Sequence, residues 1–382
     1  AGVPEGGLGG HAVLKAGFWG LLALAVMALA SYFYQASMIA HLAPEQYALV
    51  MVGLGSFLIT TSLGNAVEVV SVLRHGRPSV RGLAGLMTLA AVLSVSLALV
   101  GMLPLGVAPA LLLPIGFSAA FLVFLGGSLG AAQAGGHWSA YLMMAMLYAA
   151  TYAGLAVVCY DPFLALAIPG IAGALGGAPG LLMPVSNRFG AREATSTAVK
   201  LAPIPLLVNL DLWLASHWLG PATAAYRVPA LLGRPFFYLL GSGLAPAIRR
   251  AAASGRSLAL IAAFSLAPLI VAPVGFVSLA YLRGVLPDPW GAFRLDLLAW
   301  AIFAQASVGS FYLLINGLGH RAGHRYALAL LLLPVAFVLP PLAQILVATT
   351  GGALLLGQAS GRADLPALLR LRSKVSSRGG VT

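Results

Sequence analysis

The chain has 382 residues, of which 60% are hydrophobic and only 8% charged, and its mean hydropathy is +0.96. A soluble domain of this length needs far more charge to cover its surface. The formal net charge of +12 would favour nucleic-acid binding only if the cations formed one basic face. They lie instead in short clusters between apolar runs. The single cysteine, Cys159, excludes an intrachain disulfide and a CxxC metal site.

Apolar runs of about 20 residues, long enough to cross a ~30 Å hydrocarbon core, recur along the whole chain. Their breaks fall at Pro, Gly and charge clusters. The sequence therefore predicts an all-α integral membrane protein with about twelve spans. We expect these spans near residues 12–40, 46–72, 82–102, 109–133, 137–159, 162–186, 200–218, 222–248, 258–282, 291–316, 324–346 and 350–370.

The distribution of cations predicts the orientation of these spans. If the N-terminus is cytoplasmic, sixteen of the 21 lysines and arginines lie on alternate, cytoplasmic connections, as the positive-inside rule requires. We therefore expect both termini in the cytoplasm. Arg362, with Asp364 two residues later, is ambiguous in depth. The predicted parts are a cytoplasmic tail (1–11), an N-lobe of six spans (12–187), a cytoplasmic linker (188–199), a C-lobe of six spans (200–371) and a basic cytoplasmic tail (372–382).

The chain also repeats itself weakly, in three short matches that lie roughly 180 residues apart. The matched pairs are His41-Leu-Ala-Pro44 with His217-Trp-Leu-Gly-Pro221, Gln133-Ala-Gly-Gly-His137 with Asn316-Gly-Leu-Gly-His320, and Gly173-Ala-Leu175 with Gly352-Ala-Leu354. Because six spans is an even number, the second half enters the membrane in the same orientation. Parallel repeats of this kind form two pseudo-symmetric lobes, with the substrate path at their interface.

Three charges in residues 200–250 are the leading functional candidates. Arg234 lies about 13 residues into a span that begins near residue 222, which at ~1.5 Å per residue is close to the membrane midplane. Arg227, seven residues earlier, lies on nearly the same helical face. Asp211 lies at a depth in the preceding span that matches Arg227. One interpretation is a cationic wall for an anionic head group, oriented by Asp211; the other is a structural Asp211–Arg227 ion pair.

Other polar residues within the spans carry two interpretations each. Glu68 is either a proton-coupling carboxylate or a side chain that snorkels or pairs with Arg74 nearby. Asn65 and Gln35 either line a substrate cavity or join helices by hydrogen bonds. Gly126-Gly-Ser128-Leu-Gly130 matches the GxSxG pattern of hydrolases, but it lies inside an apolar span. Small-residue helix packing is the favoured interpretation. The sequence contains no HExxH or P-loop motif, so we expect neither a metal centre nor ATP-driven pumping.

The segments that flank these charges resemble the polysaccharide flippases of the MOP superfamily, the Wzx-type transporters of lipid-linked O-antigen and exopolysaccharide units. The opening LKAGFWGLLALAVMALASYFYQASMIAHLAPEQYALVMVGLGSFLITTSLGN is similar to that family's first two spans and the short turn between them. NLDLWLASHWLGPATAAYRVPALLGRPFFYLLGSGLAPAIRR is similar to its seventh and eighth spans. LLINGLGHRAGHRYALALLLL is similar to its turn between spans ten and eleven. The resemblance implies two six-helix lobes around a cationic cavity that work by alternating access.

Together these observations predict a flippase rather than an enzyme. It would move a polyprenyl-pyrophosphate-linked oligosaccharide across the bacterial inner membrane, without a cofactor. Arg234 and Arg227 would hold the pyrophosphate or acidic sugars. Partners would be membrane lipids and other polysaccharide-assembly proteins, and not nucleic acid. The alternatives are a cation-coupled multidrug exporter of the same superfamily, which favours acidic cavity residues, and a polytopic glycan-assembly enzyme or its partner.

Overall fold

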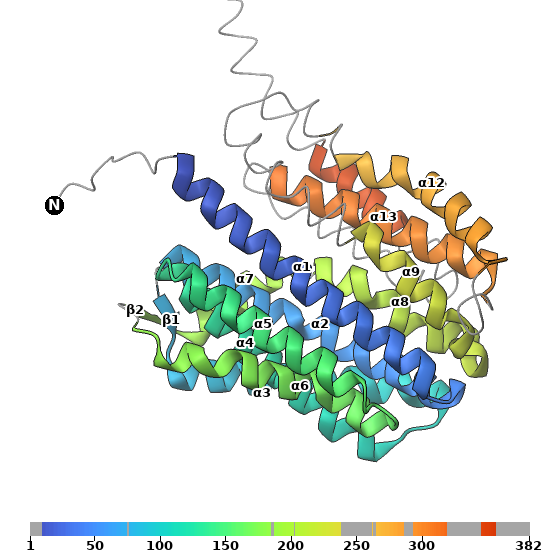
Figure 1. Cartoon of the computed structure of the whole chain (residues 1–382), viewed down its shortest axis with the longest axis horizontal. Helices are drawn as coiled ribbons and strands as arrows, with labels where there is room; N and C mark the ends of the chain where they lie inside the picture. Colours follow the sequence, from blue (N-terminus) through green and yellow to red (C-terminus); the bar gives the residue numbers. More distant parts are fainter. Residues whose placement is uncertain are drawn as a thin grey trace, which may run out of the picture. The chain divides into compact units, whose positions relative to one another are not determined.

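The computed structural model describes residues 10–74, 76–184, 187–201, 203–237, 262, 265–285, 293–318 and 345–356. Nearly every described segment is helical (Figure 1). The long helices up to the middle of the chain are α1 (Gly10–His41), α2 (Pro44–Arg74), α3 (Val80–Met102), α4 (Leu112–Ala134), α5 (Trp138–Ala156) and α6 (Pro162–Gly177). They are followed by α7 (Ala191–Leu201), α8 (Pro203–Leu219), α9 (Arg227–Pro235), α12 (Ala267–Leu282), α13 (Leu295–Leu318) and a helical segment at Ile345–Leu356. Short 3-10 helices are η1 (Leu103–Leu105), η2 (Pro109–Leu111), η3 (Ala178–Leu182) and η4 (Gly220–Tyr226).

These helices confirm the predicted all-α membrane fold class. Within the described residues, six helices are long and apolar enough to cross a membrane: Pro44–Val72, Val80–Leu105, Pro109–Ala134, Trp138–Ala156, Pro162–Leu182 and Leu295–Ile315. Each coincides with a predicted span. The predicted span at 324–346 lies almost entirely outside the described residues, as does most of the span at 350–370. The count of twelve therefore stays a prediction.

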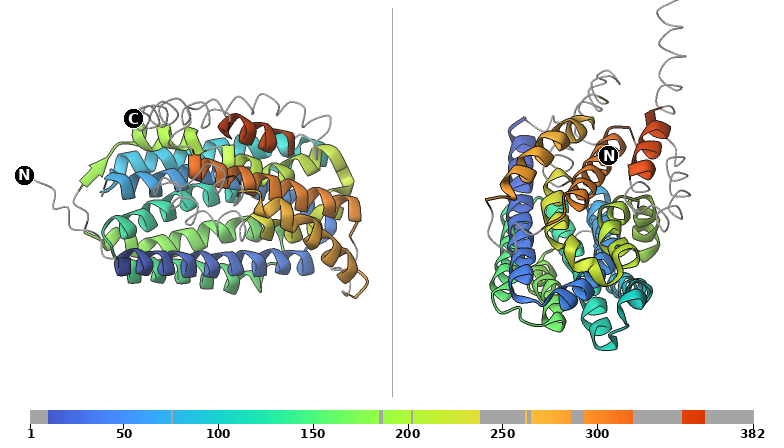
Figure 2. Two further views of the ribbon diagram at one scale, coloured as in Figure 1. Left: turned by 90° about the horizontal axis from the view of Figure 1, so that it is seen from above. Right: turned by 90° about the vertical axis from the view of Figure 1, so that its right-hand side faces the viewer.

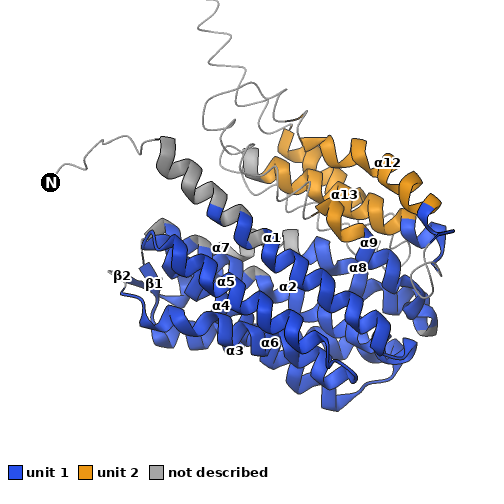
Figure 3. Cartoon of the chain, in the orientation of Figure 1, with its two compact units in different colours: residues 1–232, 282–298 blue, residues 233–281, 299–382 orange. Residues whose placement is uncertain are grey.

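The chain divides into two compact units, shown in Figure 3. Unit 1 comprises residues 1–232 and 282–298, and unit 2 comprises residues 233–281 and 299–382. This division differs from the predicted lobes, which separate at the 188–199 linker. The reason is that α8 packs against α2 and, more lightly, α3, so that it belongs to unit 1. The predicted division into two six-span lobes stays a prediction.

Within unit 1 the helices lie side by side, and α2 is at the centre of the packing. It contacts α3, α4, α7 and α8, while α4 lies between α2 and α6, and α1 packs along α5 (Figures 1 and 2). The α2–α4 contact is close because glycines face it. A Cβ on Gly126 would lie 2.5 Å from the carbonyl oxygen of Gly64, and one on Gly130 would lie 2.7 Å from the Cα of Glu68. The GxSxG segment is thus confirmed as small-residue helix packing.

A proline inside α6 is compensated by side chains from two other helices. Pro169 has no N–H, so the carbonyl of Ala165, four residues earlier, loses its helical donor. The hydroxyl of Tyr34, on α1, donates to that carbonyl at 2.5 Å. One residue further on, the Ser118 hydroxyl of α4 accepts from the Gly170 N–H at 3.0 Å and donates to the carbonyl oxygen of Leu166 at 2.5 Å. The break in α6 is therefore satisfied inside unit 1, as a membrane interior requires.

Two short strands and one helix were not predicted from the sequence. Strand β1 (Gly76–Pro78) follows α2, and strand β2 (Asn187–Phe189) precedes α7; the two pair in parallel. Helix α7 occupies most of the predicted 188–199 linker and continues to Leu201. It is amphipathic and contacts α2 and α3. At 11 residues it is too short to span a bilayer, so the linker is a structured connection without a transmembrane segment.

Candidate functional site

The predicted anionic residue, Asp211, is buried in α8 and receives a hydrogen bond from a tyrosine. The side chain has no exposed surface, and the hydroxyl of Tyr226 donates to its Oδ2 at 2.8 Å. Tyr226 is equally buried. The contact forms because η4 folds back on α8: Gly220 adopts a φ of 51°, in the left-handed region that favours glycine. The Thr223 hydroxyl then donates to the carbonyl oxygen of Ala215, 3.2 Å away. The structure thus gives Asp211 a partner, Tyr226, that the sequence did not predict.

Helix α8 is held in place by side chains that donate to backbone carbonyls of α3. The indole N–H of Trp213 donates to Leu97 at 2.9 Å, and the Ser216 hydroxyl donates to Gly101 at 2.9 Å. Gly101 also gives the room for this contact, since a Cβ there would lie 2.5 Å from Trp213 Nε1. These bonds, together with the packing on α2, fix the position of Asp211 within unit 1.

The two predicted arginines share one continuous helix, α9, which runs from Arg227 to Pro235. Their spacing of seven residues is about two helical turns, so they lie on nearly the same face, as expected. Arg227 is half-buried, whereas Arg234 is only 3% exposed. The helix begins at Arg227 rather than near residue 222, because residues 220–226 form the 3-10 helix η4. A buried guanidinium on an apolar helix is costly, about 2.5–3.5 kcal/mol at the centre of a membrane span on insertion scales, and usually marks function.

Glu68 lies in a polar cluster contributed by three helices of unit 1. It is half-buried on α2, and the side-chain amide of Gln133, on α4, donates to its Oε1. Tyr141, buried on α5, lies beside this pair. The structure therefore gives Glu68 a neutral hydrogen-bond partner on another helix. Sequence reasoning considered the charge nearest along its own helix, Arg74, and did not connect Glu68 with Gln133.

The remaining predicted cavity residues are not joined to these groups by a contact that the structure shows. Asn65 lies three residues before Glu68 on α2, hence on the same face, and its side chain is exposed. Gln35, on α1, is half-buried. The structure thus brings together Asp211 with Tyr226, and Glu68 with Gln133. Two functional candidates that sequence reasoning missed are Tyr226, which donates to Asp211, and Tyr141, which lies beside Glu68 and Gln133.

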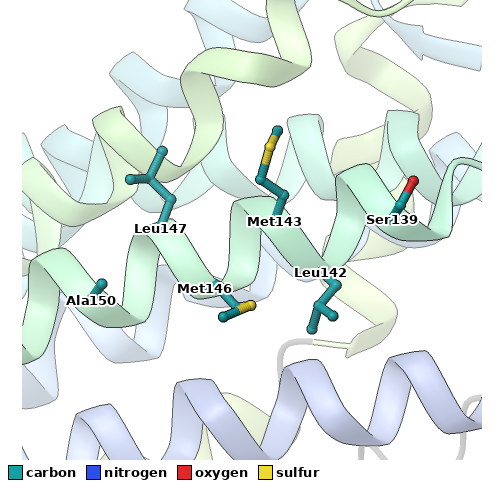
Figure 4. A pocket seen from close by; sticks show the side chains of 6 residues that line it. All are labelled: Ser139, Leu142, Met143, Met146, Leu147 and Ala150. Carbon is teal, nitrogen blue, oxygen red and sulfur yellow. The ribbon is translucent and has the colours of Figure 1, made fainter.

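A shallow groove of about 450 Å³ on α5 contains none of the predicted site residues. It is lined by Ser139, Leu142, Met143, Met146, Leu147 and Ala150 (Figure 4). All six come from a helix that is long and apolar enough to span the membrane, and Ser139 is the one polar member. A lining of this kind suits lipid chains rather than a charged head group.

The sequence matches no protein-family model and no curated protein. A solved structure described as the inward-facing conformation of a multidrug resistance MATE family transporter of the MOP superfamily aligns with the chain. The alignment covers 91% of this chain and 96% of that one, with 13% sequence identity and a TM-score of 0.49. An alignment at this level does not assign the chain to a family. The chain is a multi-pass helical membrane protein.

Proposed function

We propose that this protein is a transporter that flips a polyprenyl-pyrophosphate-linked oligosaccharide across the bacterial inner membrane, with both termini in the cytoplasm. The observation that carries the proposal is Arg234, near the end of α9, which is only 3% exposed. A buried guanidinium can engage an anionic group of a ligand with paired, charge-assisted hydrogen bonds. Pyrophosphate and acidic sugars are ligands of this kind.

The acid near the start of this region, Asp211, is held by a hydrogen bond within unit 1. Asp211 accepts a hydrogen bond from Tyr226, and both side chains are fully buried within unit 1. In this function Asp211 holds the α8–η4 turn, and so sets where α9 begins. Transport itself needs only that the anionic group bind and be released on the other side, so no covalent chemistry is invoked. We propose the flippase acts within polysaccharide assembly.

A second candidate function is a cation-coupled multidrug exporter. The observation in its favour is Glu68, an acid on a candidate membrane helix whose hydrogen-bond partner, Gln133, is neutral. A carboxylate with a neutral partner can take up and release a proton. This candidate requires that transport of an organic cation depend on Glu68, and that Arg234 be dispensable.

The test measures leaflet accessibility of a labelled polyprenyl-pyrophosphate oligosaccharide in liposomes that contain the full-length protein. Arg234→Ala should abolish movement, and Arg234→Lys should weaken it, because lysine keeps the charge but lacks the bidentate fork. The matched control is Arg294→Ala, which removes the same charge from a side chain that is 60% exposed and paired with Asp296 at 2.6 Å. It should leave transport unchanged.

Transport is expressed per folded molecule, so that a loss of folded Arg234→Ala protein is not counted as a loss of function. Normal movement by folded Arg234→Ala would refute the cationic site. Two results together would favour the exporter. The folded wild type would move none of several glycans, and it would show proton-dependent efflux of an organic cation that Glu68→Gln abolishes.

A further inference from the structure

Two segments of unit 1 that lie far apart in the sequence share one local plan. In each, a three-residue strand carries an arginine and leads into a helix with a second arginine in its first turn. In the first segment Arg77 lies in β1 and Arg81 in the first turn of α3; in the second, Arg188 lies in β2 and Arg192 in the first turn of α7. These four residues are called the four-arginine cluster below.

The fold brings the two segments together in register. Strands β1 and β2 pair in parallel with Arg77 opposite Arg188, which places both side chains on the same face of the ladder. Phe189, on the opposite face, is buried. The Ser79 N–H extends the ladder by donating to the carbonyl oxygen of Phe189 at 2.9 Å. The strands therefore fix the two arginines side by side.

The helices that follow begin next to each other as well. A Cβ on Gly82 would lie 3.1 Å from the backbone nitrogen of Ala191, so the first turns of α3 and α7 abut. Arg81 and Arg192 lie in these first turns, and both side chains are exposed. The four-arginine cluster thus occupies one end of unit 1, where Figure 1 labels β1 and β2.

This arrangement is electrostatically unfavourable without a counter-ion. Like charges directly opposite on paired strands are destabilising. A cation in the first turn of a helix also opposes the helix dipole. The acid within the two segments is Glu193, beside Arg192. The positive-inside rule accounts for cations on this side of the membrane, but it does not require them to be paired in register. An anion bound between the arginines offsets both penalties.

The position of the cluster indicates which anion. β1 connects the candidate spans Pro44–Val72 and Val80–Leu105, so it lies where two membrane helices end. That is the level of lipid head groups. Guanidinium groups match phosphate oxygens with paired hydrogen bonds. We propose that the four-arginine cluster binds the phosphate of an anionic phospholipid on the side of the membrane that the sequence predicts to be cytoplasmic, and so fastens α7 to the membrane surface. The proposal is independent of the transported substrate.

The experiment titrates the full-length protein, in a mild non-ionic detergent, with phosphatidylglycerol and in parallel with phosphatidylcholine, and counts bound lipid by native mass spectrometry. Wild type should bind phosphatidylglycerol in preference. Arg77→Gln combined with Arg188→Gln should weaken that binding about a hundredfold, since the variant loses two charge-assisted contacts that each contribute roughly a factor of ten. The charge-matched control, Arg283→Gln with Arg294→Gln, should bind as wild type does.

A second variant keeps the charges that direct membrane insertion. Arg77→Lys with Arg188→Lys should insert and fold as wild type does, yet bind phosphatidylglycerol more weakly, because lysine lacks the fork. Equal binding by wild type and both double variants would overturn the proposal. So would an equal loss in the Arg283/Arg294 control, because net charge alone would then explain the effect. Inorganic pyrophosphate that displaces the lipid at similar concentration would reassign the site to a soluble phosphate.

Discussion

Tyr34→Phe removes one hydroxyl from unit 1 and leaves the carbonyl of Ala165 without the donor that Pro169 cannot supply. The phenylalanine ring can keep the tilted ring contact with Tyr152, whose ring centroid lies 4.5 Å away. An unsatisfied buried acceptor costs about 1–3 kcal/mol in proteins generally. Hydrogen bonds measured in membrane proteins average about 0.6 and reach about 1.7 kcal/mol. We therefore expect the free energy of unfolding to fall by about 1–2 kcal/mol.

A double-mutant cycle with Pro169→Ala tests whether the Tyr34 hydroxyl satisfies the carbonyl of Ala165. An alanine at position 169 restores the N–H that can donate to Ala165, so the Tyr34 hydroxyl becomes largely redundant. In that background Tyr34→Phe should cost less than about 0.5 kcal/mol, and the difference between the two backgrounds measures the coupling. The assay is reversible unfolding of the detergent-solubilised protein by denaturant, followed by circular dichroism. If Tyr34→Phe lowers the free energy of unfolding equally in both backgrounds, the Tyr34 hydroxyl does not substitute for the N–H that Pro169 lacks.

Three further outcomes are expected. Gly126→Ala should lower the thermal unfolding midpoint by several degrees, because its Cβ would meet the backbone of α2, whereas Gly85→Ala, with open space around it, should not. Gln133→Leu should cost about 1–3 kcal/mol of stability by removing the donor to Glu68, and Glu68→Gln, which can still accept, should cost less in the same unfolding assay. Burial raises the pKa of the Cys159 thiol to about 11. Folded protein should therefore react with maleimide at pH 8 far more slowly than unfolded protein, and the thiol's contribution to stability should be lost only as pH rises from about 9 to 11. Rapid labelling of the folded protein would contradict the last expectation.

The positions of the long helices could be predicted because a membrane span has one dominant requirement, an apolar run of sufficient length. Predicted spans at 46–72 and 109–133 correspond to α2 at Pro44–Arg74 and α4 at Leu112–Ala134. The placement of Arg227 and Arg234 on nearly one face of a helix was predictable for a different reason, because an α-helix has a fixed period.

The partners of the polar residues could not be predicted in this way. Tyr226 reaches Asp211 because Gly220 takes a positive φ and η4 turns the chain back toward α8. The sequence prediction compared only the depths of residues along two straight helices, and it therefore could not include this turn. Glu68 bonds Gln133, which lies on another helix. The pairing of β1 with β2 joins two three-residue strands from distant parts of the chain, too short to give a periodic pattern. Helix α7 was missed because a predominantly polar segment between spans looks like a loop.

The compensated break in α6 also has a consequence for how the protein is made. Helices leave the ribosome in chain order, so α1 and α4, which carry Tyr34 and Ser118, are synthesised before the Pro169 segment. When α6 reaches the bilayer, the groups that satisfy its exposed carbonyls are already present. An α6 inserted alone would carry an unpaired carbonyl in hydrocarbon, at a cost of several kcal/mol. Stable residence of α6 in the membrane therefore depends on two earlier spans, α1 and α4.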